Sequence, residues 1–434
     1  MGTGTQDTGG ASTACQFTPE AYGAKGDNVT DDGAAVRSAV NAAVTYAQAH
    51  QGYAEVVFDA TRVYLVNGAL TQGGATKGNT LIPLPIIATT ARKVTLVLRG
   101  TRNSSALMHW EATTVGAVGT VIRTTLTNGT NHVTYGAASV IGGPTPQQGY
   151  GLGGDMVFNN MHVVLDGISI QCPDNPTYCG FDFRGTAEVS VISGSAIVEQ
   201  TPAGLTFANM GNHITNQWTF GLAMPHTDNN AVADIMQWSC EGFCYGLQAS
   251  EHMMALSVKC IYNIVGINCR SSTDGTAMVH ALHIAYACVE VCDYALSFND
   301  GSSKVLIDCL DVENINLQYI YDPSNLGYGP VVLRGKNITS VTLTGGANLQ
   351  VDNGEQARGH VNAPAIPAST VAIQNPFWRD GHGHCRGRSC NGGHIRNCHR
   401  SHRQEHRLDL FGSPDLLELG PAVTTPERRR PCPR

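Results

Sequence analysis

The chain has 434 residues, of which 42% are apolar and 14% charged, and its formal net charge is −7. Low charge together with 49 Gly excludes a coiled coil and a disordered chain, and it favours many short strands joined by turns of small residues. No apolar run is long enough for a membrane span, and residues 1–14 lack the basic start and apolar stretch of a signal peptide.

After a flexible N-terminus expected over residues 1–16, residues 17–53 predict a turn followed by a helix. Gly23 and Gly26 allow a sharp turn, and Asp31 or Asp32 can accept hydrogen bonds from free N–H groups at a helix start. Apolar residues then recur every three or four positions, namely Val36, Ala39, Val40, Ala43 and Ala47. This predicts a helix over 32–49 whose apolar face covers the open end of a stack of strands, because an exposed sheet edge must be covered.

The stretch "YGAKGDNVTDDGAAVRSAVNAA" (22–43) resembles the first-coil motif of the pectate-lyase-like, rhamnogalacturonase/epimerase-like β-helix family. That family includes many phage tail-spike and tail-fibre proteins and some secreted polysaccharide enzymes. The resemblance implies an all-β fold, a right-handed parallel β-helix over 54–350 with a short N-terminal capping helix. It covers about 30 residues directly, and the motif marks the cap and first coil rather than a catalytic group.

A repeat in the middle of the chain independently predicts a solenoid. Alternating apolar residues end at a cysteine four times, at Cys240, Cys260, Cys288 and Cys309. Gly246–Leu247 and Gly266–Ile267 each begin six positions after a cysteine, and Tyr294–Ala295–Leu296 stands at the same offset in the third repeat. Repeats of about 20 residues with two or three strands are typical of a β-solenoid, in which small apolar cysteines would stack as thiols.

Two shorter regions predict earlier coils. Residues 161–171 and 180–198 alternate like strands, and Asp166–Gly167 predicts a turn between strands. Cys172 and Cys179 flank a "PDNPTY" loop. Buried thiols are the main interpretation of the cysteines, and a disulfide between these two is the alternative.

The composition changes after residue 380. Residues 351–380 are interpreted as a linker or the start of a C-terminal strand module. The last 56 residues contain 11 Arg, no Lys and six acidic residues, which leaves 16 basic and 28 acidic residues in the rest of the chain. The cysteines and histidines of this tail match no paired zinc-ligand spacing. We interpret 381–434 as an aberrant, frameshifted and disordered tail, and a genuine basic disordered tail is the alternative.

Four acidic residues are the candidate catalytic groups. Glu251 and Asp300 each follow the leucine of their repeat by four residues, Asp274 lies in the corresponding turn, and Asp228 lies one coil earlier. On successive coils these carboxylates would lie about 5 to 10 Å apart. Such spacing suits acid/base chemistry at a sugar bond or a Ca²⁺ site, and solvated turns are the alternative interpretation. Trp218, Trp238 and Tyr245 are candidates for stacking on sugars, although packing explains them equally well.

Three functions remain open. The first is a tail-spike-like protein that binds, or binds and depolymerises, a cell-surface polysaccharide, located in a virion or a prophage-encoded tail. The second is a polysaccharide lyase or glycoside hydrolase that acts outside the cell after export without a signal peptide. The third is a purely structural shaft. The acidic body argues against nucleic acid as a partner, and the resemblance implies a homotrimer as a candidate assembly.

Overall fold

The computed structural model describes most of the region predicted to form coils. The described residues are 15–68, 80–88, 90–101, 119–129, 138–142, 159–199, 219–225, 232–250, 252–269, 281–298, 304–315, 317–321, 331–336 and 349–353. The chain divides into two units, Met1–Ile366 and Pro367–Arg434, and every described residue belongs to the first. The N-terminus before Cys15, the segment 354–380 and the tail 381–434 lie outside these residues, so their interpretations stay predictions.

Two parallel sheets make up the stack of coils. The strands of the first sheet are β1 (Gln16–Phe17), β2 (Asp27–Asp31), β3 (Tyr53–Val57), β4 (Val63–Leu65), β6 (Val94–Arg99), β7 (Thr120–Arg123), β9 (Asn159–Pro173), β11 (Thr186–Glu199), β13 (Ala233–Glu241), β15 (Met254–Ile261), β17 (Leu282–Glu290), β19 (Val305–Glu313), β21 (Val331–Lys336) and β22 (Leu349–Asn353). The strands of the second sheet are β5 (Thr80–Pro83), β8 (Ser139–Gly142), β10 (Cys179–Asp182), β12 (Phe220–Ala223), β14 (Tyr245–Gln248), β16 (Val265–Asn268), β18 (Tyr294–Ser297) and β20 (Gln318–Tyr321).

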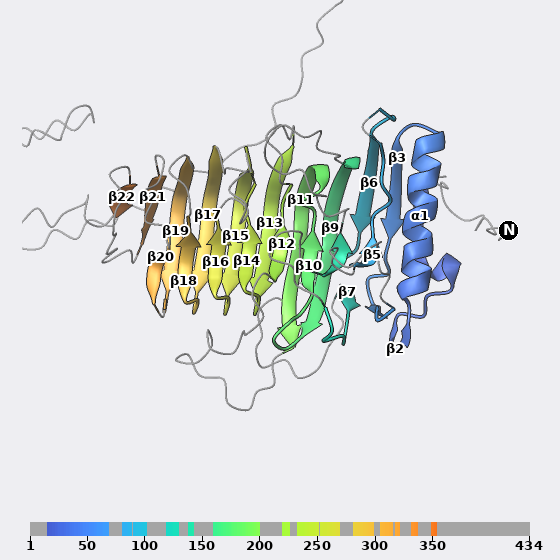
Figure 1. Ribbon diagram of the computed structural model, residues 1–434, viewed down its shortest axis with the longest axis horizontal. Coiled ribbons are helices and arrows are strands. Elements are labelled where there is room, and N and C mark those ends of the chain that lie inside the picture. The colour runs from blue at the N-terminus through green and yellow to red at the C-terminus, as the bar shows by residue number, and fades with distance from the viewer. Residues whose placement is uncertain are drawn as a thin grey trace, which may run out of the picture. The chain divides into compact units, whose positions relative to one another are not determined.

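From β9 to β20 the chain alternates between the two sheets, and consecutive strands within each sheet pair in parallel (Figure 1). This arrangement confirms the predicted fold class, an all-β parallel β-helix with one N-terminal helix. Helix α1 is too short and polar to qualify as a membrane span, and no other described helix qualifies.

Helix α1 (Gly33–Ala49) packs against β3 and β6 at the N-terminal end of the stack (Figure 1). The predicted apolar face, which includes Val36 and Val40, is buried. The two aspartates at the helix start have different hydrogen-bond partners. Asp31 accepts a hydrogen bond from the N–H of Gly33, whereas Asp32 accepts from the N–H groups of Lys25 and Gly26 and so fixes the preceding turn. A short 3₁₀ helix, η1 (Pro19–Tyr22), precedes that turn.

Inward side chains form continuous columns because successive strands pair in register. One column of the first sheet consists of Val56, Leu98, Leu165, Val191, Ile235, Ala255, Ile284, Ile307 and Leu333. The facing column of the second sheet consists of Ile82, Ile141, Phe181, Leu222, Leu247, Ile267, Leu296 and Ile320. All of them are buried in one apolar core. Each large aliphatic side chain contributes about 1.5–3 kcal/mol on burial, so every coil is stabilised by its neighbours.

A glycine position in the second sheet lets the two sheets approach closely. A Cβ added at Gly221 would lie 2.2 Å from Cys240 Sγ, and one at Gly246 would lie 2.6 Å from Cys260 Sγ. Gly266 follows in the next coil, and Ala295 takes the position after that. The predicted repeat of glycine followed by a large aliphatic residue therefore reflects close contact with the inward column of the first sheet, at Cys240, Cys260 and Val289.

The cysteine ladder is confirmed for two coils and wrong for the next two. Cys240 and Cys260 are direct partners on β13 and β15, but the inward positions after them belong to Val289 and Val312. Cys288 is instead the partner of Lys259 on the other face of the sheet. Any small apolar residue fills the inward column, and a slip of one residue moves a side chain to the opposite face.

Two further expectations are corrected. Asp166–Gly167 is not a turn between strands, because β9 runs through it; Gly167 has a φ of +74°, and the register with β11 shifts beside it. The disulfide alternative is wrong for the described cysteines, which are all free thiols, Cys172 and Cys179 included. Burial raises the pKa of the Cys240 and Cys260 thiols well above its ordinary value, so both are neutral packing groups.

Candidate functional site

The four predicted catalytic acids, Asp228, Glu251, Asp274 and Asp300, all lie outside the described residues. Along the chain, each follows a strand of the second sheet, in the order β12, β14, β16 and β18. Their assignment as equivalent positions on successive coils, and the Ca²⁺ alternative that depends on them, stay predictions. Among the described residues, no group of three or more His, Cys, Asp and Glu is arranged to hold a metal ion.

The aromatic candidates are packing residues where the structure describes them. Trp238 is fully buried, donates its indole N–H to the carbonyl oxygen of Gly246 at 3.2 Å and meets the ring of Phe181 edge-on at 5.9 Å. Tyr245 is buried and stacks on Phe220 with 5.2 Å between ring centroids. Trp218 lies outside the described residues.

Polar side chains form two rows on the face of the first sheet that is turned away from the core, because side chains alternate along each strand. The first row consists of Ser169, Ser195, Ser239, Lys259, Cys288 and Asp311. The second row consists of Gln171, Ile197, Glu241, Ile261, Glu290 and Glu313. We call these two rows the polar face. The rows begin with hydroxyls and an amide near β9 and end with charged groups near β19.

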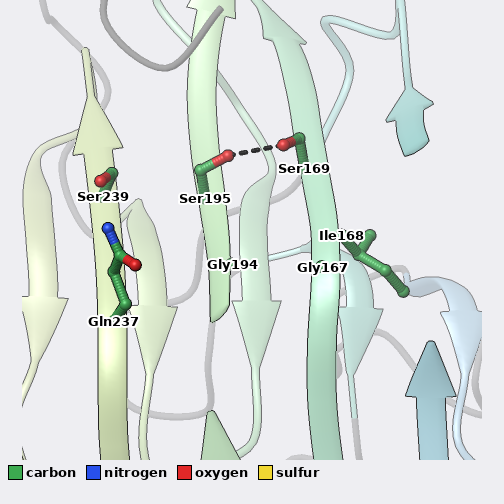
Figure 2. A pocket seen from close by; sticks show the side chains of 7 residues that line it. All are labelled: Gly167, Ile168, Ser169, Gly194, Ser195, Gln237 and Ser239. Atoms are coloured by element: carbon green, nitrogen blue, oxygen red, sulfur yellow. Dashed lines mark hydrogen bonds between the residues drawn. The ribbon is translucent and has the colours of Figure 1, made fainter. Parts of the chain in front are cut away.

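The hydroxyl end of the polar face contains a small pocket (Figure 2). Ser195 Oγ donates a hydrogen bond to Ser169 Oγ at 2.7 Å, and Gln237 and Ser239 line the pocket from the next strand, β13. The cavity volume is ≈ 10 Å³, which is room for about one water molecule and too small for a sugar ring. The pocket therefore belongs to the packing between coils and is not a ligand site.

The charged end of the polar face is more exposed to solvent than the hydroxyl end. Lys259 Nζ lies 3.6 Å from Glu290 Oε1, and the thiol of Cys288 donates to the same oxygen at 2.8 Å. The side chains of Lys259 and Glu290 are 38% and 26% exposed. Tyr286 lies on the same strand as Glu290, and its side chain is 38% exposed. Partial desolvation raises the pKa of its phenol to about 12, so the phenol is neutral at pH 7. An exposed neutral ring beside charged groups is a surface on which a sugar can stack.

Glu241 lies two coils before Glu290 in the same row and is only 2% exposed. Burial raises the pKa of Glu241 to about 8, and the ammonium group of Lys259 acts in the opposite direction with a smaller effect. The carboxyl group is therefore mostly protonated at pH 7. Because an external polymer does not reach it, Glu241 is a buried acid beneath the face and not a group that touches substrate.

Glu290 and Glu313 are the accessible carboxylates of the second row. They are direct partners on β17 and β19, and Glu313 is exposed. Adjacent strands are about 4.8 Å apart, which is close to the separation of about 5–5.5 Å between the two carboxyl groups of retaining glycosidases. Glu290 and Glu313 therefore start from backbone positions whose spacing is close to that separation.

Sequence analysis missed this pair because the coils were aligned on their cysteines. The Glu290–Glu313 pair could have been predicted by aligning the coils on the last residues of each strand. An inward residue is followed by glutamate in Cys240–Glu241, Val289–Glu290 and Val312–Glu313, immediately before the turn to the second sheet. The four acids predicted from the sequence follow strands of the second sheet along the chain and lie outside the described residues.

A second cluster joins a serine and a histidine. His162 Nε2 on β9 lies 3.0 Å from Ser190 Oγ on β11, and burial lowers the pKa of His162, so its ring is neutral at pH 7. Acyl transfer also needs hydrogen-bond donors aimed at the developing oxyanion. At Ser190, β11 pairs with β9 on one side and β13 on the other, so its N–H groups are used in the sheet. The pair therefore fits a hydrogen bond between neighbouring strands better than it fits acyl transfer.

Comparison with known proteins adds no family. No protein-family model matches the chain, and no curated protein matches its sequence. Solved structures with a similar arrangement include ORF18 of Geobacillus virus E2, with 12% identity and a TM-score of 0.35 over 78% of this chain and 60% of the phage protein. They also include the surface protein and adhesin PfbA of Streptococcus pneumoniae, with 10% identity and a TM-score of 0.21 over 78% of this chain and 100% of PfbA. The chain thus spans 60% of the length of the phage protein, and at these TM-scores no function is taken from either structure.

Proposed function

We propose that the protein binds an extended cell-surface polysaccharide along the charged end of the polar face and cleaves its glycosidic bonds between Glu290 and Glu313. The observation that carries this proposal is the in-register pairing of these two reachable carboxyl groups on adjacent coils. The tail-spike-like setting, in a virion or a prophage-encoded tail, rests on the resemblance of residues 22–43.

The geometry of the face favours a linear polymer. Lys259, Glu290 and Glu313 stand on three successive coils, so a chain lying along the stack meets a new group at each coil. Tyr286 offers an apolar ring beside them. The net charge of −7 and the acids of the face favour a neutral polysaccharide over an anionic one.

The proposed reaction is hydrolysis with retention at the anomeric carbon. Glu290, held by Lys259 and Cys288, attacks the anomeric carbon with its carboxylate while the bond to the glycosidic oxygen breaks. Glu313 gives its proton to that leaving oxygen. Water then attacks the glycosyl–Glu290 ester, returns a proton to Glu313 and releases the second product. Removing either carboxyl group leaves the ligand-binding surface in place but stops the chemistry.

The test compares Glu290→Gln and Glu313→Gln with Glu188→Gln, a control in which the carboxylate is also bound by a lysine, Lys93. Binding is measured on a glycan array, and cleavage of the bound glycan is followed by reducing ends and product size. We expect both site variants to keep binding and to lose cleavage by about 100-fold or more, whereas Glu188→Gln behaves like the wild-type protein.

The other functions give different results in the same assays. Products with an unsaturated sugar at the new end would identify a lyase and contradict the proposed hydrolysis. Cleavage that both site variants retain would place the chemistry elsewhere, with Asp228, Glu251, Asp274 and Asp300 as the next candidates. A wild-type protein that binds no glycan would favour the structural shaft.

A further inference from the structure

Lys259 stands between two acidic side chains on the polar face. Its direct partners in the first row are Ser239 on β13 and Cys288 on β17. Glu241 and Glu290 lie in the second row on those same two strands, each two residues beyond the direct partner of Lys259. Adjacent strands are about 4.8 Å apart and rise about 3.3 Å per residue, so the two acids flank Lys259 at equivalent diagonal positions.

The two acids differ in how much water reaches them. The side chain of Glu290 is 26% exposed, and Lys259 Nζ lies 3.6 Å from its Oε1. Glu241 is only 2% exposed; burial raises its pKa to about 8, and the ammonium group of Lys259 acts in the opposite direction. At pH 7 Lys259 therefore pairs with the carboxylate of Glu290, beside a Glu241 that is mostly protonated.

The titratable groups on the strands next to Glu241 are paired or neutral. Glu199 of β11 lies two residues beyond the direct partner of Glu241 and accepts a hydrogen bond from Arg123. On the core side, burial raises the pKa of the Cys240 thiol well above its ordinary value. Lys259 is therefore the cation that acts on Glu241.

The titratable groups next to Lys259 on β17 are also neutral. Desolvation raises the pKa of Cys288 and that of Tyr286 to about 12. Asp311 and Glu313 stand on β19, two coils from Lys259. The two glutamates of β13 and β17 are therefore the acids that Lys259 can serve.

We propose that Lys259 is a positioning residue for Glu290, and that Glu241 binds Lys259 in its place once Glu241 has lost its proton. A buried carboxylate without a counter-ion is costly, whereas water solvates the partly exposed carboxylate of Glu290. The ammonium group, on its flexible stem, therefore moves towards Glu241 as the pH rises above about 8. Glu290 keeps the hydrogen bond from Cys288 but loses its ammonium partner, and cleavage slows. This effect on cleavage rests on the proposed function, whereas the exchange of Lys259 does not.

The exchange is measured without substrate, by ¹³C NMR of the full-length protein with dimethylated lysines, because the chain has only six lysines. The signal of Lys259, assigned by its loss in Lys259→Arg, is expected to shift in one step centred near pH 8. Glu241→Gln should abolish this step, and Glu290→Gln should keep it. Lys93, which is paired with Glu188, is the internal reference and should show no step near pH 8.

Two NMR outcomes would overturn the proposal. One is a Lys259 signal that does not move near pH 8 in the wild-type protein. The other is an equal movement in Glu241→Gln, because the step would then report another group. Circular dichroism checks that each variant keeps the fold.

The rate of glycan cleavage tests the effect on the site. Loss of the Glu313 proton slows the wild-type protein and Glu241→Gln alike, so the ratio of their rates removes it. We expect the rate of Glu241→Gln relative to the wild-type protein to rise about 10-fold or more between pH 7 and pH 9.5, because small displacements of a reacting group are costly. Glu188→Gln is the matched control and should keep a constant ratio.

The two measurements separate this proposal from the proposed function. A constant rate ratio for Glu241→Gln beside a clear NMR step would mean that Lys259 moves without positioning Glu290, which overturns its role in cleavage. A wild-type protein that cleaves no glycan would contradict the proposed hydrolysis, and that role with it. The NMR step would then still establish or overturn the exchange of Lys259 between the two acids.

Discussion

The buried acid Glu241 gives the protein a pH-dependent stability that can be measured directly. Its pKa is raised from 4.5 to about 8 by burial. Between these values the native state holds a proton that the unfolded state has released, so stability falls as the pH rises through this window. Glu241→Gln removes the titration. The free energy of unfolding of Glu241→Gln minus that of the wild-type protein should therefore increase between pH 5 and pH 8, by at most about 4 kcal/mol.

Urea unfolding of both proteins at a series of pH values measures this difference. Glu290→Gln is the control, because it removes a carboxyl group of the same row that is partly exposed. Parallel stability curves for the wild-type protein and Glu241→Gln would contradict the prediction, since they would mean that Glu241 titrates alike in both states.

The four acids predicted from the sequence stay predictions, and the sequence did not single out the two acids of the proposed site. A column of acids on successive coils was predicted at Asp228, Glu251, Asp274 and Asp300, which lie outside the described residues, whereas the acids that pair in the structure are Glu290 and Glu313 at the ends of two strands of the first sheet. A sequence without a known register does not say which end of the strands brings the acids of successive coils together. The strand end would have been the better reference, because Val289 and Val312 are inward residues of one column.

At the scale of elements, local patterns were reliable, and the register between coils was predicted only in part. The helix expected over 32–49 is Gly33–Ala49, because its apolar spacing and its aspartates act within a few residues. Leu247, Ile267 and Leu296 are register partners as their spacing predicted. The cysteine ladder failed at Cys288, where valine serves the core equally well and nothing local marks the slip of one residue.

The helix that covers the end of the stack should be needed for stability. Val40→Asp places a charge on the buried face of α1, against β3 and β6, and should lower the free energy of unfolding by at least about 2 kcal/mol. Asn41→Asp adds the same charge on the exposed side of the helix and should change stability little. Denaturant unfolding and light scattering measure both. Equal effects of the two substitutions would mean that α1 does not seal the end of the stack.

At the scale of the whole stack, each coil contacts only the coils next to it, so stability should be local along the chain. Trp238 is the largest side chain in the middle of the core and connects neighbouring coils. It contacts Phe181, bonds to Gly246 and stands between Gly194 and Val258 in its column. Loss of the Trp238 side chain should therefore destabilise the adjacent strands most.

Trp238→Ala removes about 3–5 kcal/mol of packing and should raise amide hydrogen exchange first in β11, β13 and β15. Strands several coils away, β3 and β19, should keep their protection, because no contact carries the loss to them directly. Met236→Ala is the control, since Met236 lies on the same strand but is exposed. Amide hydrogen exchange measured peptide by peptide distinguishes a local from a uniform loss of protection. A uniform loss of protection from β3 to β19 would mean that the stack unfolds as one cooperative unit, and that the parallel β-helix is stabilised as a whole rather than coil by coil.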